Sequence, residues 1–160
     1  ADPYFYGYLN TLDKVAANLS LYYGVTGFDL SPCLNFSIEE QNAALLLNAL
    51  TNGLFLSHGI RVIPSLRIGN VETVATLKAY PNNVCYAFGC LGCNQRLQNL
   101  GRLLIELKLA MCEPSQILAY GKLSALDRNI FEKWNITVTT AMDYQTITRK
   151  RTLIRRQSHV

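Results

Sequence analysis

Short runs of β-forming residues alternate with helical segments along most of the chain, and this alternation is the strongest constraint on its fold. Six such runs, each bounded by Gly, Pro or Asn, cover residues 4–8, 25–30, 60–66, 84–88, 116–120 and 136–140. Strand–helix–strand connections favour parallel pairing with right-handed crossovers. We therefore predict an α/β fold with one domain over residues 1–145, a largely parallel sheet of about six strands with alternating helices, and a basic C-terminal tail over residues 146–160.

The length of the chain limits how such a sheet can close. A full eight-stranded barrel needs about 250 residues, so a chain of 160 residues fits an open sheet or an incomplete barrel. Residues 60–63 and 117–119 are nearly continuous apolar runs, which is typical of strands covered on both faces. We therefore expect helices on both faces of the sheet.

Several helices have recognisable starts. Ser37 with Glu40, and Ser124 with Asp127, have the spacing of capping boxes. Further helices are expected at residues 11–21, 71–79 and 95–111. The last of these carries an apolar stripe at helical spacing, formed by Leu97, Leu100, Leu104, Leu107 and Met111. We interpret it as a helix that packs on the sheet through this stripe.

Composition and cysteine usage suggest the compartment. The chain is 49% hydrophobic and 16% charged, which is enough apolar material for a core without metal or disulfide staples. No apolar stretch reaches the ~20 residues of a membrane span, and no signal peptide is visible. The five cysteines do not form a dense disulfide framework. We expect a protein without membrane contact, in the cytoplasm, which would be the bacterial host cytoplasm if the chain comes from a phage.

The positive charge is concentrated at one end. Of 15 Lys and Arg, five lie in the last dozen residues, so 10 remain against 11 acidic residues and the rest of the chain is close to neutral. The five are Arg149, Lys150, Arg151, Arg155 and Arg156. Spaced in this way they can follow a phosphate backbone. The tail therefore suggests contact with nucleic acid or an acidic protein partner, and the alternative is a tail that only aids solubility.

Part of the sequence resembles a known family. The motifs are Ser31-Pro32 followed by Phe36-Ser37, then residues 58–65 (HGIRVIPS), and later residues 114–122 (PSQILAYGK). Together they are similar to the uncharacterised family called Domain of Unknown Function 4417, over about residues 24–122. The resemblance implies a bacterial, phage or mobile-element origin and supplies no activity.

The chain also departs from that family's pattern. Residues 7–10 (GYLN) stand where the family has an acidic pair, Cys33 replaces an Asp, and Arg67 stands where an aromatic residue is usual. If those acids carry the chemistry of the family, the resemblance implies that this member has lost it.

The predicted fold indicates where a ligand would bind. In parallel sheets, ligands bind at the carboxyl ends of the strands, where helix N-termini also point. On the predicted strands this rim carries Asn10, Ser31, Cys33, Asn35, Arg67, Asn70, Cys90, Cys93, Asn94, Arg96, Tyr120 and Lys122. Cations and amides predominate there, so the rim suits a phosphate or nucleotide better than a divalent cation. We select Arg67, Asn70, Asn94 and Lys122 as ligand-binding candidates; the alternative is that Arg67 and Lys122 are solvated edge residues.

Few residues qualify for catalysis. Asp29 lies between Phe28 and Leu30, where burial could raise its pKa for general acid or base work, although a hydrogen-bonded structural carboxylate is an equal alternative. Cys90 is a candidate nucleophile or redox thiol at a helix start. His58 is interpreted as a partner of a helix C-terminus.

The cysteines also suggest a weak metal site. Cys85, Cys90 and Cys93 have part of the spacing of an iron–sulfur motif, and Cys112 could supply a fourth ligand. Buried cysteine as a small apolar residue is the commoner role. We therefore predict no cofactor.

Two functional hypotheses follow. The first is an accessory protein of phage or mobile-element type, whose α/β body is a scaffold and whose tail contacts nucleic acid or an acidic partner. The alternative is a small enzyme or binder for a phosphorylated or nucleotide ligand at the C-terminal edge of the parallel strands, with Asp29 or Cys90 as the reactive group if there is one.

Overall fold

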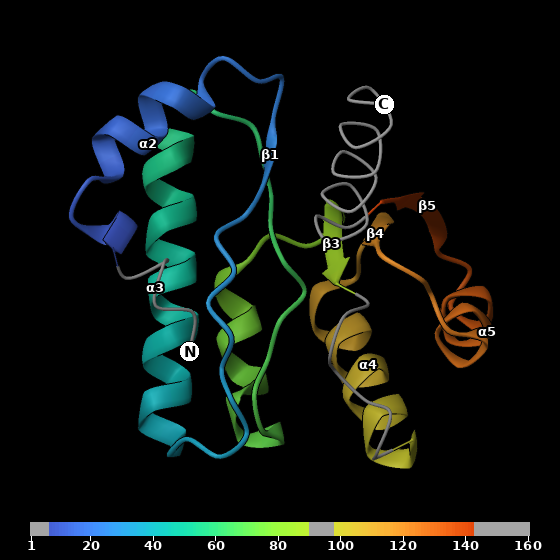
Figure 1. Cartoon of the computed structure of the whole chain (residues 1–160). Helices are drawn as coiled ribbons and strands as arrows, with labels where there is room; N and C mark the ends of the chain where they lie inside the picture. The colour runs from blue at the N-terminus through green and yellow to red at the C-terminus, as the bar shows by residue number, and fades with distance from the viewer. Residues whose placement is uncertain (1–6, 90–97, 143–160) are drawn as a thin grey trace, which may run out of the picture.

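The computed structural model describes residues 7–89 and 98–142 of the chain, which form a mixed helix and strand fold (Figure 1). In chain order the elements are α2 (Leu12–Leu19), β1 (Val25–Thr26), α3 (Ile38–Ser57), β2 (Val62–Ile63), the 3-10 helix η1 (Val71–Ala79), β3 (Cys85–Gly89), α4 (Gln98–Cys112), β4 (Gln116–Tyr120), α5 (Ala125–Lys133) and β5 (Thr137–Ala141). The predicted alternation of strands and helices is confirmed over this part of the chain.

All strand pairs are parallel, as predicted. β1 pairs with β2 in a two-stranded sheet, and β3, β4 and β5 form a three-stranded sheet in that order. One isolated parallel bridge, from Ser65 to Ala87, connects the two sheets. The backbone N–H of Leu66 donates to the Ala87 carbonyl at 2.8 Å, and the Ala87 N–H donates to the Pro64 carbonyl at 2.9 Å. The strands therefore follow one another in space in chain order, as they do in part of a barrel.

The prediction of about six strands in one sheet is wrong, because the described residues form five strands in two small open sheets. The described part of the run at residues 4–8 is not a strand, because Gly7 and Tyr8 lie in a helical turn. Residues 4–6 lie outside the described residues. Asn10 consequently does not follow a strand.

The run at residues 25–30 is a strand for only two residues, because side chains of α3 replace a neighbouring strand beyond that point. The Phe28 N–H donates to Asn52 Oδ1 at 2.8 Å, and the Leu30 N–H donates to Asn48 Oδ1 at 2.7 Å. Asn48 Nδ2 donates back to the Leu30 carbonyl at 3.0 Å. The extended segment therefore satisfies its backbone against a helix, and no strand ladder is needed.

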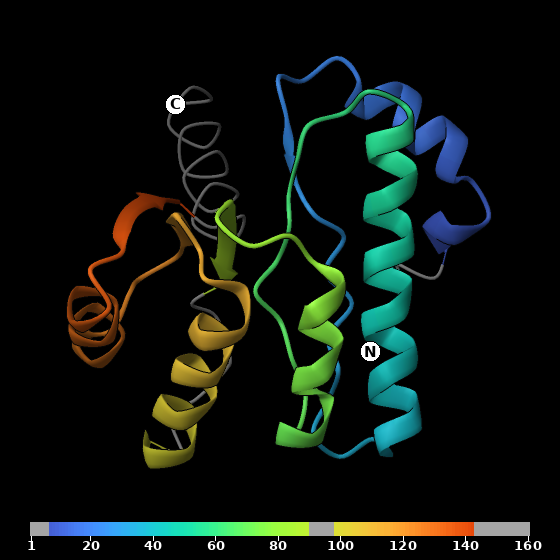
Figure 2. The same cartoon turned by 180° about the vertical axis from the view of Figure 1, so that it is seen from behind.

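Four helices of the described residues, α3, η1, α4 and α5, form one layer on one side of the strands, whereas helices on both faces were predicted. Neighbouring helices contact one another in the order α3, η1, α4 and α5, and Figure 2 shows them side by side in this order from right to left. The physical reason is the strand order, because right-handed crossovers between strands that follow in sequence all pass on the same side.

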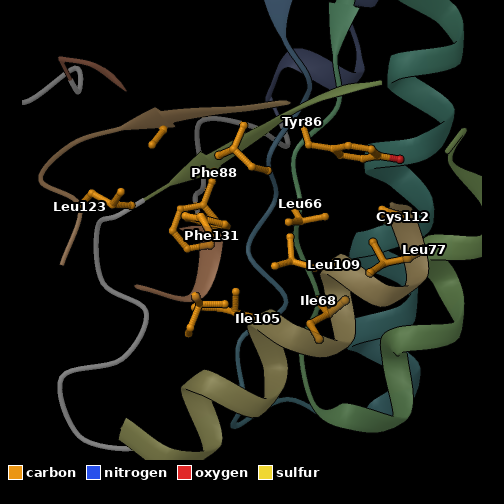
Figure 3. Close-up of a cluster of buried hydrophobic side chains, with 13 residues drawn as sticks. Leu66, Ile68, Leu77, Tyr86, Phe88, Ile105, Leu109, Cys112, Leu123 and Phe131 are labelled. Atoms are coloured by element: carbon orange, nitrogen blue, oxygen red, sulfur yellow. The ribbon is translucent and has the colours of Figure 1, made fainter. Parts of the chain in front are cut away.

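The main core lies between this helix layer and the three-stranded sheet (Figure 3). Phe88 and Phe131 meet edge to face, with ring centroids 5.4 Å apart. From α4 the fully covered side chains are Ile105, Leu109 and Cys112. The predicted stripe lies at the edge of this buried face: Leu104, Leu107 and Met111 are only partly buried. Leu97 and the side chain of Leu100 lie outside the described part.

Both predicted capping boxes are confirmed. Ser37 Oγ accepts from the Glu40 N–H at 3.2 Å, and Glu40 Oε2 accepts from the Ser37 N–H at 2.9 Å. Ser124 and Asp127 form the same reciprocal pair at the start of α5.

Among the helices in residues 7–89 and 98–142, none is long and apolar enough to cross a membrane.

Candidate functional site

Three polar side chains converge where the strands end. Both nitrogens on one edge of the Arg67 guanidinium donate to the Asp29 carboxylate, Nε to Oδ1 at 2.9 Å and Nη2 to Oδ2 at 2.5 Å. The Tyr120 hydroxyl donates to Asp29 Oδ2 at 3.1 Å. These residues are 38 and 91 positions from Asp29 in the sequence, so only the fold brings them together. We call this group the Asp29–Arg67–Tyr120 cluster.

Strand alternation turns all three side chains to the same face. In extended chain, successive side chains point to opposite sides. Each member of the cluster is adjacent to residues whose side chains are buried in a hydrophobic cluster; these are Phe28, Leu30, Leu66, Ile68 and Ala119. The cluster therefore lies on the face of the strands opposite the helix layer, which would be the interior of a complete barrel.

Gly89, the last residue of β3, leaves the space in which Tyr120 lies. It is the register partner of Tyr120 on β4. A Cβ atom at Gly89 would lie 2.8 Å from the Tyr120 hydroxyl oxygen and 2.9 Å from two ring carbons. A side chain at this position would therefore displace the ring that reaches Asp29.

The ion pair at the centre of the cluster is largely removed from solvent. The side chains of Arg67 and Asp29 are 20% and 21% exposed. A two-bond contact between guanidinium and carboxylate combines charge with fixed geometry. The result is a guanidinium held in one orientation at the strand ends.

Tyr120 is a hydrogen-bond donor over the whole physiological range. Burial, together with the negative charge of Asp29, raises its pKa to about 12, while the charge of Arg67 acts in the opposite direction. The nearby Ser65 hydroxyl also lowers the pKa of Tyr120. The buried Ser65 Oγ lies close to Tyr120 but has no hydrogen-bond partner within the described residues.

We expect Tyr120 to ionise two pH units above an ordinary tyrosine. Because its folded pKa of about 12 exceeds the ordinary value of 10.0, the stability that neutral Tyr120 contributes is complete below pH 10 and is lost as the pH rises through about 12. A rapid pH-jump titration of tyrosinate absorbance, wild type minus Tyr120→Phe, measures this step, and Tyr23→Phe is the matched control at an exposed ring. A Tyr120 step near pH 10 would contradict the proposed environment.

The structure places four of the sequence candidates. Asp29 and Arg67 meet in the cluster, where the Asp29 carboxylate is hydrogen-bonded. Asn70 precedes η1, where its backbone N–H donates to Gln41 Oε1 at 2.7 Å and its side chain makes no cap bond. Lys122 is exposed just after β4.

Other candidates lie outside the described residues. They are Cys90, Cys93, Asn94 and the tail cations Arg149, Lys150, Arg151, Arg155 and Arg156. Tyr120 belonged to the predicted rim but was not selected as a site residue. Its position as the last residue of a buried strand was the sequence feature that could have indicated its place in the cluster. Ser65 and Gly89 were not selected as site residues from the sequence.

The described cysteines do not support a metal site. Within residues 7–89 and 98–142, no group of three or more His, Cys, Asp or Glu could hold a metal ion. Cys112 is fully buried beside Tyr86. Cys85 precedes Tyr86 on β3, so its side chain points to the opposite face of the strand. Burial raises the pKa of both thiols, which disfavours the thiolate that binds metals.

His58 has the predicted structural role. It is the C-cap of α3, and its backbone N–H donates to the carbonyls of Leu54 and Phe55, both at 3.1 Å. Its ring Nε2 lies 3.7 Å from Asp13 Oδ1, at an exposed position away from the cluster.

Comparison with known proteins adds no family to these observations: no family model, curated protein or solved structure matches the chain.

Proposed function

We propose that the C-terminal edge of the parallel strands binds a small anionic ligand of the phosphate or nucleotide class. The observation that carries this proposal is the convergence of Asp29, Arg67 and Tyr120, from three distant segments, at that edge. Structural ion pairs can form anywhere on a surface, but this pair lies where parallel α/β folds place their ligands.

The charges at this edge support an anion. Asp29 engages one edge of the Arg67 guanidinium and sets its orientation, which reduces the conformational entropy that a ligand would have to remove. Lys122 is exposed immediately after β4. Because η1, α4 and α5 each follow a strand, their N-termini also point to this side, and helix N-termini favour negative charge.

Binding fits the cluster better than catalysis does. Tyr120 keeps its proton up to about pH 12 and donates it to Asp29, whereas general acid–base catalysis needs a group that titrates near the working pH. We therefore propose a binding role, with Arg67 and Lys122 as the cationic contacts. Catalysis through Asp29 or Cys90 is the less supported form of the same hypothesis.

Calorimetric titration tests this proposal with inorganic phosphate, AMP and ATP as probes. We expect at least one probe to bind the intact chain. Lys122→Ala removes one charge-assisted contact and Arg67→Lys removes the guanidinium fork, so we expect each to weaken binding of that probe about tenfold or more. Arg67→Lys keeps the positive charge beside Asp29 and so protects the fold. Arg128→Ala, at an exposed position on α5, is the matched control.

Two results would count against the site. One is the absence of binding by any of the three probes to a folded wild-type protein. The other is binding that Lys122→Ala, Arg67→Lys and Arg128→Ala leave equally strong, since the contact would then be elsewhere.

A second function rests on the tail. We propose that Arg149, Lys150, Arg151, Arg155 and Arg156 contact nucleic acid or an acidic partner, as in an accessory protein of phage or mobile-element type, which is also the origin that membership of the Domain of Unknown Function 4417 family would imply. The support is the clustering of five cations in the last dozen residues. Within the described residues Cys85 and Cys112 are free thiols, which supports a cytoplasmic location for either function.

Nucleic-acid binding across a salt series tests the tail. Five phosphate contacts give a slope of log K against log salt of about −4 to −5 on duplex DNA. We expect this slope for the intact chain and its loss in a truncation to residues 1–148. Equal binding by both forms would exclude the tail as the contact.

A further inference from the structure

Ser65 carries a buried hydroxyl group that its surroundings do not satisfy. The residue is 7% exposed, and its Oγ has no hydrogen-bond partner within the described residues. A buried hydroxyl without a partner costs free energy, and alanine would occupy nearly the same space without that cost. The Ser65 hydroxyl therefore lowers the stability of the fold, which is a common feature of functional sites.

The strand register places Ser65 beside Tyr120. Ser65 forms a parallel bridge with Ala87, which is the register partner of Leu118 on β4. Tyr120 is two residues further along β4, so its side chain is on the same face of the strands. The Ser65 hydroxyl also lowers the pKa of Tyr120, which requires the two side chains to be close. Two oxygen atoms therefore lie near the Tyr120 hydroxyl: Asp29 Oδ2, to which it donates, and Ser65 Oγ.

The hydrogen bond from Tyr120 to Asp29 is replaceable. Its length is 3.1 Å, whereas a hydroxyl that donates to a carboxylate normally lies ~2.5–2.7 Å away. Asp29 also keeps both bonds from the Arg67 guanidinium when the phenol leaves. A hydroxyl that turns from Asp29 to Ser65 loses a long hydrogen bond and satisfies a buried group, so the two positions are close in free energy. A ligand that favours one position can therefore select it.

We propose that Tyr120 is a latch at the strand-end site, closed on Asp29 before a ligand binds and turned to Ser65 afterwards. This inference rests on the proposed function and adds the class of ligand. Once the phenol has turned, Asp29 Oδ2 accepts a hydrogen bond from the ligand instead. A carboxylate repels a phosphate oxygen but accepts from a neutral donor. The ligand is therefore a phosphorylated sugar, free or as part of a nucleotide, with a hydroxyl at Asp29 and its phosphate at Lys122.

Calorimetric titration of the full chain with AMP, ribose 5-phosphate and methyl phosphate tests the latch. At about pH 8 methyl phosphate is fully ionised and carries no hydrogen-bond donor. We expect at least one of the two sugar compounds to bind, and Ser65→Ala to weaken its binding about fivefold, the equivalent of one hydrogen bond. Binding of methyl phosphate should not change. Ser57→Ala, at an exposed position on α3, is the matched control.

Two further measurements show whether Ser65 is a positioning residue that acts through the Tyr120 hydroxyl. In a Tyr120→Phe background, Ser65→Ala is expected to have no effect on binding of the same compound, because no hydroxyl remains to turn. Ser65→Ala alone is expected to melt at the same or a higher temperature than wild type, because it removes an unsatisfied buried group. A clearly lower melting temperature would show that the Ser65 hydroxyl is already bonded while the latch is closed, and would overturn the proposal.

Failure of the latch is distinguishable from failure of the anion site. If the wild type binds a probe, and Ser65→Ala leaves all binding unchanged or weakens every probe equally, the latch is wrong and the anion site stands. Binding of methyl phosphate alone has the same meaning. Absence of binding by all three probes to folded wild-type protein would overturn both.

Discussion

Replacing Asn48 with alanine is expected to lower the free energy of unfolding by about 3 kcal/mol. The reason is that two buried backbone groups lose their hydrogen-bond partners, and each unsatisfied group costs ~1–3 kcal/mol. Asn48 is 3% exposed, and its amide accepts from the Leu30 N–H and donates to the Leu30 carbonyl. Nothing else in the described chain replaces these bonds, because this segment runs beside α3 without a strand partner. Urea unfolding of Asn48→Ala against wild type measures the loss.

Asn129→Ala is the matched control, since Asn129 is exposed on α5. Amide exchange at Leu30 provides a local measure and should accelerate in Asn48→Ala because the N–H loses its acceptor. A loss of less than ~1 kcal/mol would mean that water replaces the amide, and that Asn48 does not hold this segment against α3.

Arg67→Ala is expected to destabilise the protein by about 2–4 kcal/mol. Removing one partner of a fully buried ion pair costs ~3–5 kcal/mol, and the lower estimate reflects the residual exposure of about a fifth of each side chain. Asp29 then loses both guanidinium bonds and its charge is uncompensated, although the Tyr120 hydroxyl still donates to it. Thermal and urea unfolding measure the change.

A double-mutant cycle distinguishes the pair from simple loss of side-chain packing. Asp29→Asn combined with Arg67→Met removes both charges, and we expect it to be less destabilised than the sum of the single variants by ~1 kcal/mol or more. The exposed pair of Arg102 and Glu106 on α4 is the comparison, and Arg102→Ala should have a clearly smaller effect. Additive effects of Asp29→Asn and Arg67→Met would show that the contact contributes no coupling.

Local signals explain the parts of the fold that were predicted correctly. The capping boxes at Ser37 and Ser124 depend on residues three positions apart, and both formed. β4 has the predicted bounds because Gln116–Tyr120 is a buried run of β-forming residues between turn residues. Parallel pairing followed from the alternation alone.

Non-local partners explain the errors. Residues 27–30 look like a strand in sequence, yet Asn48 and Asn52 take the place of the neighbouring strand. On α4, apolar residues cover a wide arc, and the packing partners decided that Ile105, Leu109 and Cys112 are at the centre of the buried face, with the Leu104 stripe at its edge. Periodicity shows that a helix has an apolar side but does not give the centre of that side.

Two members of the Asp29–Arg67–Tyr120 cluster were named from the sequence, but their contact was not predicted. Arg67 and Asp29 were both named, but as an anion contact and a general acid or base, and the sequence offered no reason to pair residues 38 positions apart. Tyr120 and the space at Gly89 depend on the register of β3 and β4, which a single sequence does not specify.

The sequence by itself determined the alternating elements, their parallel direction, the helix starts and the edge at which polar side chains end the strands, because each depends on neighbours within a few residues. The tertiary structure alone decided that the strands follow in chain order in two small sheets, that the helices share one face, and that a carboxylate, a guanidinium and a phenol meet on the other. These features depend on contacts between distant segments, whose free energies arise only when the chain is packed.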